Sequence, residues 1–95
     1  MANPCENTLY ATGSEEVLDI ISKFLKENFD ADVEIEDDYL DAYFDSKWTF
    51  PLEAMEELFN TIPKQEDFYI RCLSVEYGCM YHALWYCDKN GWHDT

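Results

Sequence analysis

The chain has 95 residues, of which 47% are hydrophobic and 17% are aromatic, and its formal net charge at pH 7 is −15. This apolar content excludes a disordered acidic tail, and the length fits a single domain over residues 1–95 with a modest core. The charge excludes DNA, RNA and anionic lipid as direct partners, because all three would be repelled, whereas a basic partner should associate fast and with strong salt dependence.

Nothing in the sequence is typical of a membrane or secreted protein. No run approaches the roughly 20 apolar residues of a membrane span, and residues 1–13 lack the basic start and apolar centre of a signal peptide. We therefore predict a cytoplasmic location. In that reducing compartment the cysteines are expected to be reduced, buried and unpaired. They are Cys5, Cys72, Cys79 and Cys87.

A strand, a turn and a helix are predicted first. Residues 5–12 alternate loosely between apolar and polar types and end at Gly13. Ser14, followed by two glutamates, is typical of a helix N-cap. Apolar residues then recur at spacings of three and four through about Asn28, which predicts an amphipathic helix. Its buried face is expected to carry Val17, Leu18, Ile21, Phe24 and Leu25.

From Asp32 the hydrophobic period changes to two, which is typical of a half-buried strand. Val33 and Ile35 share one side of this run, and acids share the other. A second alternating run follows Asp37 and Asp38, so the two runs form either one bent strand or a hairpin. The second run places Tyr39, Asp41, Tyr43, Asp45 and Lys47 opposite Leu40, Ala42, Phe44, Ser46 and Trp48.

A second helix and further strands complete the chain. Pro51 suits the first turn of a helix, Thr49 is its expected cap, and the helix should end before Pro63. Residues 68–76 and 79–87 are predicted strands, and residues 88–91 form a tight turn before a short extension of the sheet at Trp92 and His93. The apolar face of this helix is expected to carry Leu52, Met55, Leu58, Phe59 and Ile62.

The order of these elements predicts the fold class. It is β-α-β(β)-α-β-β, which is an α+β arrangement. Two helices can then cover one face of a mainly antiparallel sheet, so we predict a ferredoxin-like, or split βαβ, sandwich.

The acidic block, residues 27–45, is the most informative stretch, because its 19 residues carry nine carboxylates and no lysine or arginine. A block of like charge repels itself, and its plainest use is attraction to a basic surface that normally holds nucleic acid. Tyrosines among the acids can anchor an interface. We predict a partner-binding site formed by Asp32, Glu34, Glu36, Asp37, Asp38, Tyr39, Asp41, Tyr43 and Asp45.

One row of acids is too sparse to imitate nucleic acid. Residues on one face of a strand repeat every ~6.6 to 6.8 Å, whereas duplex DNA carries a charge every ~1.7 Å of axis. At least two rows are needed, and the helix acids Glu53, Glu56 and Glu57 are expected to extend the surface. The alternative is that the acids only keep the chain soluble and prevent pairing at the sheet edge.

Metal sites and cofactors are not expected. Residues 30–41 begin like a calcium-binding EF-hand loop, but Ile35 replaces the required glycine and Asp41 replaces the final glutamate. A zinc site would need Cys79, His82, Cys87 and His93, whose spacing is poor. Cys72 and Cys79 could instead face each other across a hairpin, paired or simply packed.

No sequence pattern indicates an enzyme. A nucleophile elbow, a phosphate-binding loop, a zinc-protease motif and a dinucleotide-binding glycine pattern are all absent. With 21 acids, paired carboxylates are expected by chance. We therefore predict no catalytic residue.

Three strings, residues 7–13, 46–54 and 76–78, resemble the YubB-type ferredoxin-like domain family of plasmids and phages. They read Asn-Thr-Leu-Tyr-Ala-Thr-Gly, Ser-Lys-Trp-Thr-Phe-Pro-Leu-Glu-Ala and Glu-Tyr-Gly. The resemblance implies a mobile-element origin and the ferredoxin-like topology, without an iron–sulfur cluster, and it supplies no catalytic residue. The acidic segment before Trp48 departs from the family pattern, so the resemblance implies nothing about the role of this segment.

Together these observations lead to a hypothesis: a small phage protein, acting in the host bacterial cell, that inhibits a nucleic-acid-binding defence factor such as a CRISPR effector or a restriction enzyme. The acidic block would mimic DNA or RNA in the basic groove of that factor. The alternative is an accessory domain of a mobile element that recognises its partner through aromatics around Trp48, Tyr81 and Trp85. A metal-binding protein is a third, lesser alternative.

Overall fold

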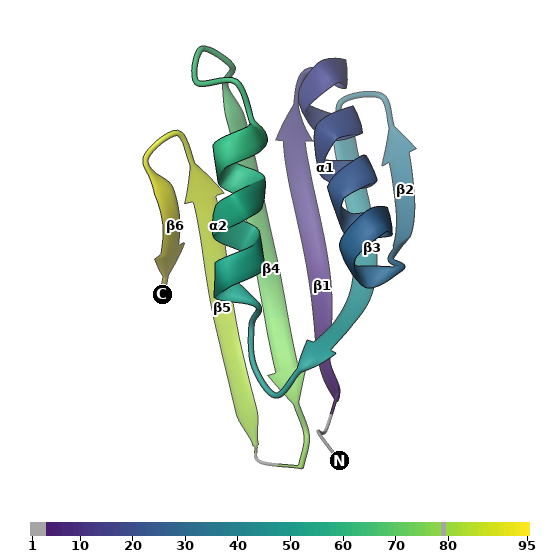
Figure 1. Cartoon of the computed structure of the whole chain (residues 1–95), viewed down its shortest axis with the longest axis vertical. Coiled ribbons are helices and arrows are strands. Elements are labelled where there is room, and N and C mark those ends of the chain that lie inside the picture. The colour runs from purple at the N-terminus through teal and green to yellow at the C-terminus, as the bar shows by residue number, and fades with distance from the viewer. Residues whose placement is uncertain (1–3, 79) are drawn as a thin grey trace.

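The computed structural model describes residues 4–78 and 80–95. In this part of the chain, six strands form an antiparallel sheet in the order β2-β3-β1-β4-β5-β6, and both helices lie on the same face of it (Figure 1). The elements are β1 (Pro4–Gly13), α1 (Glu15–Phe29), β2 (Asp32–Glu36), β3 (Tyr39–Lys47), α2 (Leu52–Thr61), β4 (Phe68–Glu76), β5 (Tyr81–Asp88) and β6 (Gly91–Asp94). The predicted α+β class, with two helices on one face of an antiparallel sheet, is confirmed. Because β5 and β6 extend the sheet beyond β4, the strand order is not that of a simple ferredoxin-like fold.

The acidic block forms a hairpin and not one bent strand. β2 and β3 pair from Asp32 opposite Tyr43 to Glu36 opposite Tyr39. Asp37 and the residue after it make the turn, and Asp37 has φ 36°, a left-handed conformation that aspartate tolerates better than most residues. The open side of the sheet therefore receives acids from two adjacent strands.

The predicted start of the first helix is confirmed. The side chain of Ser14 caps α1 by accepting a hydrogen bond from the Val17 N–H at 3.3 Å. The helix ends at Asp30, which is its C-cap in the left-handed conformation with φ 53°. Of the five residues predicted on its apolar face, Phe24 is half-buried and the other four are buried.

The predicted start of the second helix is wrong in detail. Pro51 is the N-cap of α2, one position before the first turn, and no side chain caps the helix. Thr49 is not the cap, because its hydroxyl donates to the Phe50 carbonyl at 3.4 Å. The reason is a tight turn at Trp48, which has φ 69° and is followed by a hydrogen bond from the Thr49 N–H to the Lys47 carbonyl at 2.7 Å.

The core lies between the helices and the sheet. Alternate residues of the central strands pack against the apolar faces of α1 and α2, and burying each large side chain contributes about 1.5 to 3 kcal/mol. The fully buried residues include Leu9, Ala11, Leu18, Ile21, Leu25, Leu40, Met55, Leu58 and Ile70.

Three of the cysteines are free and buried, as predicted, and the fourth, Cys79, lies outside the described residues together with its suggested pairing to Cys72. Burial raises the pKa of the Cys72 thiol and of the Cys87 thiol to about 12. Since the thiolate is the reactive form, both groups act as packing residues at neutral pH.

Candidate acidic protein-binding face

Carboxylates gather on the helix-free side of β2, β3 and β1. The strand pairing places Glu34 opposite Asp41, and Asp45 opposite Glu6. Paired residues of an antiparallel sheet point to the same side, and here it is the side opposite to the alternating buried residues that form the core beneath the helices. We call this surface the acidic face, and its six carboxylates, all on exposed residues, belong to Glu6, Asp32, Glu34, Glu36, Asp41 and Asp45.

The acidic face has more than one row of acids, and a single row would be too sparse to imitate nucleic acid. Neighbouring strands are ~4.7 to 4.9 Å apart, and same-face residues of one strand repeat every ~6.6 to 6.8 Å. Acids on three adjacent strands therefore form a two-dimensional array. The predicted contribution of Glu53, Glu56 and Glu57 is wrong, because α2 lies on the other side of the sheet (Figure 1).

The carboxylates of this face are not neutralised by the chain itself. Within β1, β2 and β3 the only basic residue on this side is Lys47, at the end of β3. In the described part of the chain, none of the six carboxylates forms an ion pair. Like charges directly opposite each other destabilise a sheet, so Glu34 against Asp41 and Glu6 against Asp45 lower the stability of the fold.

Arg71 marks the boundary of the acidic face. It lies on β4, opposite Tyr10, and its guanidinium carbon is 4.7 Å from the centre of the Tyr10 ring. Tyr10 in turn stacks against Tyr39 at 5.9 Å. These contacts run across β4, β1 and β3 and end beside Glu36, which pairs with Tyr39.

The two predicted tyrosine anchors differ in their exposure. Tyr43 is 62% exposed, whereas Tyr39 is half-buried and its hydroxyl donates to the Glu36 carboxylate at 3.3 Å. Tyr43 also lines a hollow of about 450 Å³ together with three acids. These acids are Asp32, Glu34 and Asp41. A carboxylate-lined hollow with a tyrosine in it suits an arginine or lysine side chain.

The pKa of the Tyr39 hydroxyl responds to the negative potential of the acidic face. The negative charge of Glu36, the hydrogen bond to that carboxylate and the charges of Asp41 and Asp37 raise the pKa of the Tyr39 hydroxyl above its usual value. The neutral hydroxyl can donate to Glu36, whereas the phenolate would be repelled by it.

We expect Glu36→Gln to lower the pKa of Tyr39 toward about 10, because the substitution removes the largest source of negative potential. NMR titration of the Tyr39 ring carbon bonded to oxygen measures this pKa directly. Glu53→Gln, which removes the same charge from α2, is the control and should leave the Tyr39 pKa unchanged. Equal responses to the two substitutions would contradict a local field at this face.

An exposed apolar strip, which was not predicted from the sequence, borders the acidic face on β4 and β5. It consists of Leu73 and Leu84, which are 45% and 39% exposed, and Arg71 separates it from Tyr69, which is 39% exposed. Leu73 pairs with Leu84 on one side and with Thr8 on the other, and Thr8 pairs with Tyr43. A signal was present in the sequence, since Arg71 is expected to point to solvent and Leu73, two residues later in the same predicted strand, must share its side.

The two segments considered for metal binding do not gather ligands. Residues 32–36 are a strand and Asp30 caps α1, so the acidic block does not form an EF-hand loop. In the zinc alternative, Cys79 lies outside the described residues, and Cys87 is buried on the helix side while His82 is exposed on the open side. Among residues 4–78 and 80–95, no group of three or more potential ligands is placed to hold a metal ion.

Comparison of the chain with known protein families, curated proteins and solved structures finds no match. None of the helices within residues 4–78 and 80–95 is long and apolar enough to cross a membrane.

Proposed function

We propose that this chain is a small, non-enzymatic phage or other mobile-element protein that inhibits a host nucleic-acid-binding defence factor. The target class is a CRISPR effector or a restriction enzyme, in the bacterial cytoplasm. The acidic face enters the basic groove of that factor and competes with DNA or RNA. Asp37 and Asp38, at the turn of the acidic hairpin, extend the contact beyond the strands.

The observation that carries this proposal is the uncompensated array of six carboxylates on one side of the sheet. Solubility alone would be served by charges of both signs, which also avoid like-charge pairs. Here two like-charge cross-strand pairs lower stability, and a basic partner would relieve that repulsion on binding.

The fold is the second support for a mobile-element origin. Strands β1 to β4 and both helices follow the order β-α-β-β-α-β with the spatial order β2-β3-β1-β4. We infer that this part is a ferredoxin-like unit to which β5 and β6 add one edge, which agrees with the resemblance to the YubB-type family.

The proposal is tested by capture of partners from a bacterial lysate on immobilised protein at low and high salt. The triple variant Asp32→Lys, Asp41→Lys and Asp45→Lys should lose the captured nucleic-acid-binding proteins, and raised salt should release them from the unmodified chain. The matched control carries the same charge change on the helices, in Asp19→Lys, Glu27→Lys and Glu57→Lys, and should retain them.

A second function, an accessory interaction domain of a mobile element, is favoured by the exposed apolar strip and by Trp48, which is 46% exposed. The other two aromatics suggested for this role are only half-buried and contact Phe50. Tyr81 accepts a hydrogen bond from the Phe50 N–H, and Trp85 stacks on the Phe50 ring. Such a partner would stay bound at high salt, and the sheet triple variant would still capture it.

A further inference from the structure

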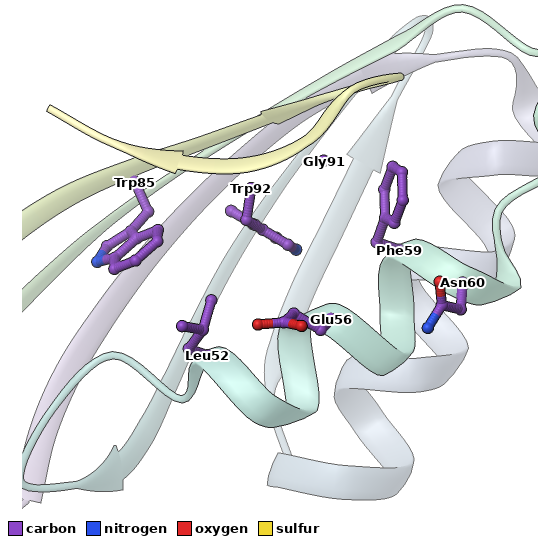
Figure 2. Close-up of a pocket in the computed structure, with 7 residues that line it drawn as sticks. All are labelled: Leu52, Glu56, Phe59, Asn60, Trp85, Gly91 and Trp92. Carbon is purple, nitrogen blue, oxygen red and sulfur yellow. The ribbon is translucent and has the colours of Figure 1, made fainter.

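A groove lies on the helix side of the sheet, at the edge opposite to β2. Figure 2 shows it between α2 and the strands β5 and β6. Its volume is about 380 Å³. Leu52, Glu56, Phe59 and Asn60 line it from α2, and Trp85, Gly91 and Trp92 line it from the opposite side.

The two tryptophan rings are held in place by contacts inside the chain. Trp85 stacks on Phe50 with ring centres 4.7 Å apart and an angle of 7° between the planes. Trp92 meets the same Phe50 ring at 5.2 Å and 61°, and its Nε1–H donates to the Met55 carbonyl at 2.7 Å. Both indoles are therefore positioned before any ligand binds, which lowers the entropic cost of binding.

The chemistry of the groove selects for a cation. The indole N–H of Trp92 is already used, so this ring presents only its π surface and its carbon edge to a ligand. Glu56 adds an exposed carboxylate, and Asn60 adds an amide that can accept a hydrogen bond. Indole faces beside a carboxylate are the usual surroundings of ammonium and guanidinium groups in proteins.

One of the aromatic rings that line the groove already contacts an ammonium group of the chain itself. The Nζ atom of Lys64 lies 3.6 Å from the centre of the Phe59 ring, one of the lining side chains. The long-range electrostatic field of the chain also attracts cations, because the net charge is −15. From these observations we infer that the groove binds the side chain of a lysine or an arginine presented by another polypeptide.

This site is separate from the acidic face. The two surfaces lie on opposite sides of the sheet (Figure 1), and they share no residue. The inference therefore does not rest on the proposed function, and either one can fail without the other.

The test is a titration of the purified chain with Nα-acetyl-lysine methylamide and with Nα-acetyl-arginine methylamide at constant ionic strength. Two-dimensional NMR of the indole N–H groups follows Trp85, Trp92 and, as an internal control, Trp48. We expect saturable shifts of Trp85 and Trp92 but not of Trp48. Nα-acetyl-norleucine methylamide, which has an apolar side chain and no charge, should give no saturable shift.

Glu56→Gln should weaken the binding of the cationic probes by roughly five-fold. Glu57→Gln is the matched control, because it makes the same charge change at an exposed neighbouring position that does not line the groove, and its effect should stay within about two-fold. Equal losses in the two variants, equal binding of the norleucine probe or no saturable shift would each overturn the inference. Thermal melting of both variants checks that the fold is intact.

Discussion

Asn7→Leu is expected to lower the free energy of unfolding by about 3 kcal/mol. Asn7 is 1% exposed, and its side chain joins three strands. Its amide donates to the carbonyls of Cys5 and Phe44, each at 3.2 Å, and to the Ser46 hydroxyl at 2.9 Å. Its carbonyl oxygen accepts from the fully buried Ser74 hydroxyl at 2.6 Å.

Leucine can replace none of these bonds. Removal of one partner leaves buried polar groups without their hydrogen bonds, and each such group costs about 1 to 3 kcal/mol. Because the four bonds share one side chain, their losses are not additive, and a total near 3 kcal/mol is expected. Burial of the apolar leucine side chain recovers only part of this loss of free energy.

Urea unfolding followed by tryptophan fluorescence measures the change. Thr8→Val is the control, because Thr8 is the next residue of β1 but lies exposed on the open side of the sheet, where the effect should stay within about 0.5 kcal/mol. A loss for Asn7→Leu no larger than that of the control would mean that the network does not support the fold.

Several residues that carry the family resemblance stabilise the fold. Asn7 and Ser46 belong to the network just described, and Phe50 is buried between Trp85 and Trp92. Glu76 is 2% exposed and accepts from the Gly78 N–H at 2.7 Å. The residues that carry the resemblance therefore bear on how the chain folds, and none of them belongs to the acidic face.

Local patterns predicted the elements well. The cap at Ser14, the alternation in residues 39–47 and the apolar spacing of both helices depend on neighbours in the sequence, and the structure confirms them. The predicted start of the second helix was wrong because Trp48 adopts a left-handed backbone conformation in the turn before the helix. A tryptophan at this position does not indicate such a conformation.

Features that combine distant segments could not be predicted. The pairing of Glu34 with Asp41 depends on where the hairpin turns, and the side occupied by Glu53 depends on how the chain crosses the sheet. Likewise, Trp85 was interpreted as an exposed recognition residue. Its contact with Phe50 joins residues 35 positions apart, and periodicity carries no information about such a pair.

Asp41→Lys is expected to change stability and partner binding in opposite directions. Asp41 is exposed on the acidic face, opposite Glu34 on β2 and opposite Tyr10 on β1. A lysine there replaces a like-charge pair with an opposite-charge pair across the strands. The free energy of unfolding should rise by about 0.5 to 1 kcal/mol.

The same substitution places a positive charge inside the surface that meets the basic groove of the partner. Like charges brought together in an interface cost several kcal/mol, so affinity for that partner should fall by about 100-fold. Calorimetry of the purified pair and urea unfolding of the free variant measure the two changes independently.

Asp19→Lys separates the local effect from the change in total charge. Asp19 is exposed on α1, on the other side of the sheet, and the substitution changes the net charge by the same amount. At physiological ionic strength the Debye length is about 8 Å, so its effect on affinity should stay below about three-fold.

Because the expected changes in stability and in affinity have opposite signs, Asp41→Lys can distinguish a binding role from simple damage to the fold. A substitution that merely damages the fold lowers stability and binding together, so a gain in stability with a loss of binding excludes that explanation. An acidic face that serves only solubility would also show the gain in stability, but the partner would bind Asp41→Lys as tightly as it binds the unmodified chain. A gain in stability together with a loss of affinity is expected only if the mutually repelling carboxylates bind a basic partner.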